Sequence, residues 1–485
     1  MREREKMSTA IDILRERESL LRPRSPEDKI VEEASSSTSS KEAFAARLAV
    51  PDDNGRLVSL DVFRGLTVAL MILVDDAGGA FPSINHSPWF GVTVADFVMP
   101  LFLFIVGVSV SLVFKNALCK PVATKKVLLR TVKLFLLGLA LQGGYFQGRG
   151  KLSYGVDVYR IRVMGVLQRI SIGYLLASLS EIWLANNTPV ELQMSLFKKY
   201  RAQWIFMLFL SSCYMCLLYG VYVPDWTFQI PNSTSVEPGV QFVTCGVRGS
   251  LEPPCNAIGF IDRLLLGKEH LYQRPVYRRL KECSVRSPDY GPLPPDFPPW
   301  CLAPFDPEGI TSSLMAAVTC LVGLQFGHVL VHYKSPVQRL YVWSVASFVL
   351  VVVGYLLEFL GIPSSKPLYT MSYTCITAGV AGMLLTATYY ILDVRHIEKP
   401  TKILQWMGMN ALLIYVLAAC NLFLIAVQGF YWSSPENNLV DGTELILQTI
   451  FRSDRWGTLS FVVLEIILWG MCAGFLSWKR IFVKI

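Results

Sequence analysis

Long apolar runs separated by short polar segments dominate the chain after residue 55. A helix needs about 20 mainly apolar residues to cross the hydrocarbon core of a bilayer. Runs close to this length occur ten times and predict ten membrane-spanning helices. Their limits are residues 60–77, 93–114, 130–146, 163–184, 203–223, 309–332, 339–361, 368–391, 404–429 and 457–478. The pattern therefore predicts an all-α polytopic membrane protein with one long loop, residues 224–308.

Residues 1–55 have the opposite character, because they are charged, rich in serine and without an apolar run of signal-peptide length. This composition predicts a disordered tail, followed by one transmembrane domain at residues 56–485. Within the tail, the stretch ERESLL (Glu16, Leu20 and Leu21) fits the acidic dileucine pattern of sorting to endosomes, lysosomes or vacuoles. Such short patterns also arise by chance, so a tail without a sorting role is the alternative.

The charge distribution gives the expected orientation in the membrane. The 485 residues are 52% hydrophobic and carry a net charge of +8, with basic residues spread over many short loops. This spread is typical of topology signals and does not indicate a nucleic-acid-binding surface. The tally of Lys and Arg places both termini in the cytoplasm, although residues 147–162 oppose it with four basic residues. Residues 78–92 and 224–308 are then expected to face the lumen.

The long loop supports a luminal location on separate grounds. It holds a glycosylation sequon at Asn232 and a group of four cysteines: Cys245, Cys255, Cys283 and Cys301. Four cysteines in one loop predict two disulfides in an oxidising compartment, with three connectivities open. A zinc site is the alternative, but the spacing lacks a CxxC pair.

Ionisable residues inside or beside the spans are the candidates for chemistry, because a bilayer tolerates them poorly. Asp61 and Arg64 are three residues apart near the cytoplasmic end of the first span. They are expected to form an ion pair, or Arg64 binds an anionic cytoplasmic ligand. Arg169 lies deep in the fourth span and implies a carboxylate partner, for which Asp96 is the candidate.

One luminal pocket is expected to gather the imidazole of His86 with several charged residues: Asp75, Asp76, Asp96 and Arg169. A carboxylate beside an imidazole orients the ring and makes it a candidate general base. The alternative is that His86 is an ordinary loop histidine. The other histidines lack a comparable cluster of acids in the sequence: His270, His328, His332 and His396.

These segments carry a resemblance to a known family. RLVSLDVFRGLTVALMILVDDAGG, NHSPWFGVTVADFVMPLFLFIVG, RVMGVLQRISIGYLL, NAIGFIDRLLLGKEHLY, FDPEGITSSLMA, KPLYTMSYTCITAG and WMGMNALLIYVLA occur in this order. Together they resemble the heparan-alpha-glucosaminide N-acetyltransferase family over residues 56–485. The resemblance implies transfer of acetyl from cytoplasmic acetyl-CoA to a luminal glucosamine in the lysosomal or vacuolar membrane. It assigns the active-site histidine to His86.

Two departures from the family pattern stand out. An asparagine thought to assist the histidine is matched by Asp75. The animal enzymes have a further luminal domain and span where this chain has its tail, so ten spans are expected instead of eleven.

The implied mechanism gives roles to further residues, and no metal is expected. Arg64, Arg130 and Lys133 would hold the phosphates of acetyl-CoA. His86 would deprotonate the acceptor amine or carry the acetyl group itself, and Asn85 or Arg169 would stabilise the oxyanion.

The edges of the long loop offer further substrate contacts. Asp262, Arg263 and Glu308 line the sugar, or they anchor the loop through caps and salt bridges. Gly- and Ser-containing spans allow a homodimer. A secondary transporter is the alternative function, because five spans on each side of the long loop suit inverted repeats. However, the halves share no sequence similarity.

Overall fold

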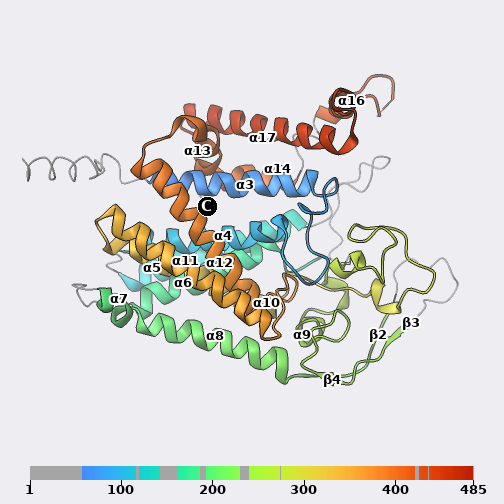
Figure 1. Ribbon diagram of the computed structural model, residues 1–485, viewed down its shortest axis with the longest axis horizontal. Helices are drawn as coiled ribbons and strands as arrows, with labels where there is room; N and C mark the ends of the chain where they lie inside the picture. The colour runs from blue at the N-terminus through green and yellow to red at the C-terminus, as the bar shows by residue number, and fades with distance from the viewer. Residues whose placement is uncertain are drawn as a thin grey trace, which may run out of the picture. The chain divides into compact units, whose positions relative to one another are not determined.

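The computed structural model describes residues 57–115, 119–142, 161–185, 193–229, 240–273, 275–420, 425, 427–434 and 436–483. Helices dominate this part of the chain, and the strands are confined to two short hairpin-like pairs near one end (Figure 1). The predicted class, an all-α polytopic membrane protein, is confirmed. The tail with its dileucine and the sequon residue Asn232 lie outside the described residues.

A helix lies at each of the ten predicted positions. These helices are α3 (Val58–Ala77), α4 (Val94–Phe114), α5 (Lys120–Gln142), α6 (Val166–Leu184), α8 (Arg201–Gly220), α10 (Ile310–His332), α11 (Pro336–Phe359), α12 (Met371–Tyr389), the pair α13 (Lys402–Met409) and α14 (Ala411–Ala419), and α17 (Asp454–Trp478). Three shorter helices are α7 (Gln193–Lys199), α9 (Ala257–Leu266) and α16 (Leu439–Phe451). The predicted boundary was wrong for α5, which begins at Lys120 and not near residue 130.

Not all of these helices are equally apolar. Among the described residues, six are long and apolar enough to cross a membrane: α4, α8, α10, α11, α12 with its π-helical extension, and α17. The pair α13 and α14 counts as a seventh if it is one span, but it bends by 75° at Asn410. The apolar run alone did not predict this break. Helices α3, α5 and α6 fall outside the set, and each of them carries charged side chains.

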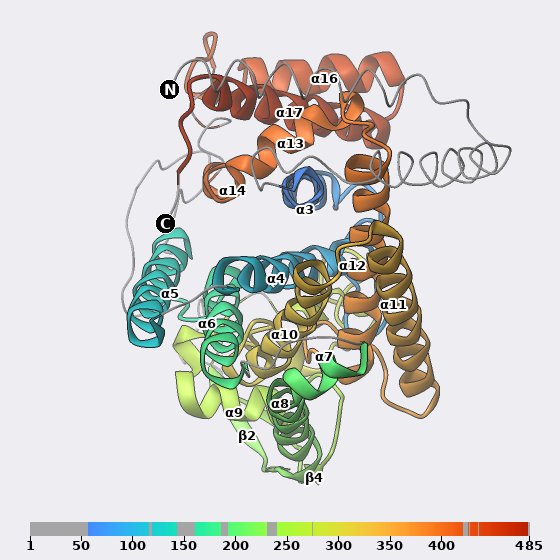
Figure 2. The same cartoon turned by 90° about the vertical axis from the view of Figure 1, so that its left-hand side faces the viewer.

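The helices form two groups that meet along α3 and α4. In Figure 2, α3 lies with α13, α14, α16 and α17, whereas α6, α8 and α10 lie with α4. The backbones of α4 and α10 approach closely at Gly107, where a Cβ atom would lie 1.9 Å from the carbonyl oxygen of Cys320. Small residues at such crossings allow membrane helices to pack tightly.

Three loops join at the predicted luminal end. The indole N–H of Trp89 donates to the carbonyl of Leu251 at 2.9 Å, and its ring packs against Tyr277 and Phe305. The N–H of Gly91, in the left-handed region at φ +91°, donates to Ser364 in the loop between α11 and α12. The segment that carries His86 is therefore held by two other loops, the long loop and the loop between α11 and α12.

The long loop is held by strands and disulfides. Strand β1 (Tyr222–Val223) pairs with β4 (Val247–Arg248), and β2 (Trp226–Gln229) pairs with β3 (Val240–Val243); both pairs are antiparallel. Disulfides join Cys245 to Cys255 and Cys283 to Cys301. The prediction of two disulfides is confirmed, and the structure selects one of the three connectivities.

Candidate active site

A small cavity lies where α3, α4 and α14 meet the three joined loops. Its volume is about 120 Å³. Typical ligand pockets measure about 300–1,000 Å³, so this cavity is too small to hold a whole substrate of that size. Its polar lining comes from Asp75, His86, Glu308 and Lys366. The rest of its wall is mostly apolar: Met71, Val74, Ala95, Val98, Met99, Phe102, Val166, Tyr415 and Ala419.

Asp96 lies in the first turn of α4 and contacts the His86 ring. The fully buried carboxylate accepts from the N–H of Thr93 at 3.0 Å, the Thr93 hydroxyl at 2.9 Å and the N–H of Ser87 at 3.1 Å. Its other oxygen lies 2.9 Å from His86 Nδ1. A carboxylate at Nδ1 favours the tautomer with the proton there, which leaves Nε2 as the proton acceptor. The predicted carboxylate–imidazole arrangement is present, with Asp96 as the acid.

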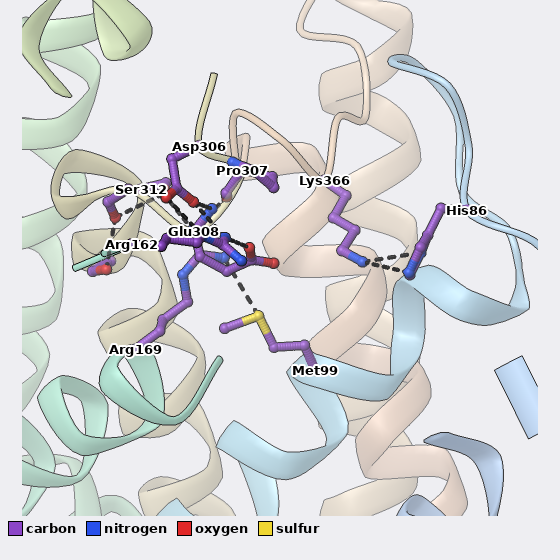
Figure 3. A network of polar contacts seen from close by, with 11 residues as sticks. His86, Met99, Arg162, Arg169, Asp306, Pro307, Glu308, Ser312 and Lys366 are labelled. Atoms are coloured by element: carbon purple, nitrogen blue, oxygen red, sulfur yellow. Dashed lines mark hydrogen bonds and ion pairs between the residues drawn. The ribbon is translucent and has the colours of Figure 1, made fainter. Parts of the chain in front are cut away.

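Lys366 is a site residue that we did not predict. It comes from the loop between α11 and α12, and Figure 3 shows its ammonium group directed at the His86 ring. Its Nζ lies 2.9 Å from Nδ1, 3.2 Å from Nε2 and 3.8 Å from an oxygen of Asp96. Two unit charges 3 Å apart repel by about 5 kcal/mol at an effective dielectric of 20. Lys366 and His86 therefore do not carry positive charge together.

The electrostatics of this cluster favour a neutral imidazole. Loss of solvent and the nearby ammonium of Lys366 lower the pKa of His86, against the opposing effect of Asp96 and Glu308. Burial alone would raise the pKa of Glu308, but Arg162, Arg169 and Lys366 lower it to about 2. The cavity therefore contains a permanent carboxylate opposite a ring that resists protonation.

Behind Glu308 lies an ion-pair network (Figure 3). Arg162 donates to both oxygens of Asp306 at 2.9 and 2.6 Å, and also to Glu308. These carboxylates raise the pKa of Arg162 although burial opposes them. In the sequence Arg162 was only a basic residue on the unexpected side of the membrane. Its two carboxylate partners explain how it is accommodated there.

The predicted ion pair between Asp96 and Arg169 was wrong. Asp96 pairs with His86 and Lys366, whereas the buried guanidinium of Arg169 donates to the carbonyl of Pro307 at 2.6 Å and the hydroxyl of Ser312 at 2.5 Å. A carbonyl and a hydroxyl at the start of α10 satisfy this cation in place of a carboxylate. Arg169 therefore supports the segment around Glu308 and does not line the cavity.

Of the other residues predicted for the pocket, one lines the cavity and two do not. Asp75 lines the cavity at the end of α3, whereas Asp76 and Asn85 are not part of its lining. The amide of Asn85 donates to Asp289 at 3.0 Å, and its oxygen accepts from the N–H of His86 at 2.8 Å. Asn85 thus shapes the loop, and the geometry does not support its predicted oxyanion role.

The three predicted coenzyme-binding residues face different helices. Arg64 pairs with Asp61 at 3.1 Å, as predicted, and donates to Ser109 on α4 at 2.7 Å. Arg130 lies 5.0 Å from the ring of Tyr174 on α6, and Lys133 is exposed on α5. The structure does not bring the three together around one anion.

Asp262 and Arg263 act within the loop. Asp262 accepts from the N–H and hydroxyl of Thr311, both at 3.3 Å, and so caps the start of α10. Burial raises the pKa of Asp262 to about 7. The guanidinium of Arg263 lies 3.8 Å from the ring centre of Trp226, and burial lowers its pKa to about 10. These contacts favour the anchoring role over the sugar-binding one.

The fold and the site define a polytopic membrane protein whose histidine–carboxylate pair lies beside a small, partly open cavity. Residues 56–228 match the family model described as "Heparan-alpha-glucosaminide N-acetyltransferase, catalytic". The chain is similar to heparan-alpha-glucosaminide N-acetyltransferase of Mus musculus, with 30% identity over 84% of this chain and 59% of that protein. The Homo sapiens protein of the same name is 28% identical over 84% of this chain and 58% of its own length.

These matches confirm the resemblance that the sequence motifs predicted. They also limit its reach, because the chain spans less than three-fifths of the length of both relatives. All the residues around His86 that come from α3, α4 and the loop between them lie within the matched range. Glu308 and Lys366 lie outside it, in the region covered only by the two relatives.

Proposed function

We propose that the chain is a transmembrane acetyltransferase. It moves an acetyl group from acetyl-CoA, supplied from the cytoplasm, to the amine of a luminal, glucosamine-like acceptor. The observation that carries this proposal is the 2.9 Å contact between His86 and Asp96 at the edge of a small, partly open cavity. The similarity to proteins named heparan-alpha-glucosaminide N-acetyltransferase supports the reaction class.

In the proposed reaction, the amine nitrogen attacks the thioester carbonyl of acetyl-CoA. A C–N bond forms and the C–S bond breaks, so that the products are an N-acetylated acceptor and the free thiol of CoA. Nε2 of His86 accepts the proton that the amine loses and returns it to the departing sulfur. In the second route, Nε2 first takes the acetyl group itself and then passes it to the amine. Both routes require the neutral ring.

The shape of the cavity supports entry of the donor from within the membrane. Its apolar lining includes Met71 and Val74 of α3 and Ala95, Val98, Met99 and Phe102 of α4. Apolar side chains on two helices suit contact with the thioester end of an acyl carrier. The acceptor would approach from the side of Glu308, whose carboxylate attracts an ammonium group. A lysosomal or vacuolar membrane, with both termini in the cytoplasm, is the proposed location.

The test measures transfer of labelled acetyl from acetyl-CoA to glucosamine in membranes that contain the full chain. We expect transfer by the wild type and none above background by His86→Ala. His328→Gln is the matched control, since it changes another carboxylate-paired histidine far along the chain and should retain transfer. Equal transfer by wild type and His86→Ala would refute the proposed site.

A secondary transporter remains the second candidate because of one observation, the 75° break between α13 and α14. Broken helices line the substrate sites of many transporters. Flux of glucosamine into vesicles without acetyl-CoA, together with the absence of acetyl transfer to amine and hydroxyl acceptors, would favour this function and reject the acetyltransferase.

A further inference from the structure

We propose that Lys366 is a positioning residue that keeps His86 in its neutral, proton-accepting form while Asp96 orients the ring. The inference rests on the proposed function for its purpose, but its physical content concerns only the protonation of His86. Lys366 lies outside the matched range of the family model and 280 positions from His86 along the chain.

The geometry is the first argument. A lysine that merely paired with Asp96 would approach the carboxylate more closely than the ring. Here Nζ is 2.9 and 3.2 Å from the two ring nitrogens and 3.8 Å from the nearer carboxylate oxygen. The ammonium therefore acts on the imidazole at least as strongly as on Asp96.

The balance of charge is the second argument. The groups that face the imidazole are Asp96 from α4, Lys366 from the loop after α11, Glu308 from the loop before α10, and Asp75 at the end of α3. Three of these four are carboxyl groups, which stabilise a positive charge near them. Burial is the first influence that lowers the pKa of His86 and the ammonium of Lys366 the second, so removing Lys366 would bring the ring closer to protonation.

The same carboxylates decide which of the two basic groups holds the proton. On balance the pKa of Lys366 is lowered, first by burial and also by Arg169, although Asp96, Glu308 and Asp75 act to raise it. Starting from about 10.4, a lysine retains its proton at pH values where a histidine, starting from about 6.5, releases it. The single positive charge that the cluster tolerates therefore resides on Lys366, and the imidazole of His86 stays neutral.

The position of Lys366 is fixed by its loop. The hydroxyl of Thr370 donates to the carbonyl of Pro363 at 2.9 Å and accepts from the N–H of Ser365 at 3.1 Å. Ser364 in turn accepts from Gly91 in the loop of His86 at 2.8 Å. The loop of the lysine and that of the histidine are thus joined directly, which sets the separation between the two side chains.

The test uses diethyl pyrocarbonate, which reacts with neutral imidazole and not with imidazolium. The full chain in lipid nanodiscs is treated across a range of pH, and modification of His86 is followed by mass spectrometry of its peptide. We expect the midpoint of Lys366→Met to lie about one pH unit or more above that of the wild type. Lys366→Arg keeps the charge and should keep the midpoint within a few tenths of a unit.

Two controls accompany the measurement. Asp96→Asn should move the midpoint of His86 in the opposite direction, since it removes the group that favours imidazolium. The exposed His396 provides an internal reference for the reagent in every sample, and a size-exclusion profile like that of the wild type verifies that a variant is folded. An unchanged His86 midpoint in Lys366→Met, or an equal shift in Lys366→Arg, overturns the inference.

Acetyl transfer is measured on the same samples. Transfer by the wild type with no change of the His86 midpoint in Lys366→Met would reject the role of Lys366 and leave the proposed function standing. Absence of transfer in the wild type with the expected midpoint shift would reject the proposed function and retain the electrostatic role. If both hold, the acidic limb of kcat in Lys366→Met should shift upward together with the midpoint.

Discussion

Among the described residues, two carboxylate–imidazole pairs occur, and they differ in what surrounds the ring. At the predicted luminal end, His86 contacts Asp96 at 2.9 Å, and its side chain remains 34% exposed beside the cavity. Within the helices, His328 on α10 contacts Glu181 on α6 at 2.8 Å, and its side chain is only 4% exposed. The pair distance is nearly the same, so the distance alone does not identify an active site.

In the second pair, neighbouring side chains contact both the Glu181 carboxylate and the His328 ring. Gln203 donates to Glu181 at 2.8 Å, and Gln325 donates to Gln203 at 2.9 Å. The ring of Tyr200 stacks on His328 with 3.6 Å between ring centres, and Gln325 lies near the second ring nitrogen. His86 instead has the ammonium of Lys366 at its ring and keeps about a third of its side chain exposed beside the cavity. A base must be within reach of its substrate, and of these two rings only that of His86 is accessible.

A large apolar cavity beside His328 sharpens the contrast. It measures about 470 Å³ and is lined mainly by apolar side chains of α8, α10, α11 and α12. It is far larger than the cavity at His86. The ring nitrogens of His328 nevertheless contact Gln325 and Glu181. Size therefore does not locate the chemistry here, whereas an accessible ring among charged groups does.

Replacing each histidine by glutamine would separate the two pairs most strongly. We expect His86→Gln to lower kcat for acetyl transfer by about 10²–10⁴-fold, the range for loss of a general base. His328→Gln retains an amide that can bond Glu181, so kcat per folded molecule should stay within about twofold. A comparable loss of kcat in both variants would remove the distinction between the pairs.

Neutralising the acid of the first pair should have a smaller effect. Asp96→Asn keeps the shape but offers a poorer acceptor to Nδ1, so the ring loses its preferred tautomer and orientation. We expect a loss of kcat of about 10²-fold with little change in KM. Asp289→Asn is the matched control, because Asp289 contacts Asn85 and not the ring. If Asp289→Asn loses as much kcat as Asp96→Asn, the loss comes from a disturbed loop around His86 and not from the contact between His86 and Asp96.

Neutralising the acid of the second pair should change stability instead. Glu181→Gln removes a charge that binds His328 and Gln203 inside the bundle. Hydrogen bonds to charged groups are worth about 1.5–3 kcal/mol, and we expect a loss of unfolding free energy of about 2 kcal/mol. Thermal unfolding in detergent tests this, with kcat per folded molecule unchanged. An intact melting temperature with reduced kcat would assign Glu181 to the chemistry.

The pH dependence of transfer gives the finest comparison. Because the pKa of His86 lies below its usual 6.5, the neutral ring persists as the medium becomes acidic. The rate therefore falls only when pH drops through this lowered pKa. A histidine with an ordinary pKa of about 6.5 would lose about tenfold of its neutral form at pH 5.5. We expect kcat with saturating acceptor to lose less than this ordinary histidine would, and a tenfold loss would contradict the lowered pKa.

The parts of the site that sequence reasoning predicted depend on local geometry. His86 and Asp96 are ten positions apart, and a carboxylate in the first turn of α4 readily caps the helix and meets the preceding loop. The helices were predictable because apolar length is a bilayer requirement, and the disulfides because four cysteines share one loop.

What the sequence did not predict depends on contacts between distant segments. Lys366 is 280 positions from His86, and Arg162 is 144 positions from Asp306. We expected no acids near His328, but Glu181 comes from another helix, 147 positions away. Arg169 was assigned a carboxylate because charge pairing is the usual solution, whereas its partners are a carbonyl and a hydroxyl. Tertiary packing decides such partners, and periodicity carries no information about it.

Asp96 serves α4 and His86 with the same carboxylate. The free energy that starts the helix and the free energy that orients the base are consequently linked. By this linkage, a ligand that binds the oriented ring also protects the first turn of α4 against fraying. Conversely, a lipid or substitution that unwinds that turn silences His86 without contacting it. Hydrogen exchange at the start of α4 thus becomes a direct reading of how much of the protein is ready to react.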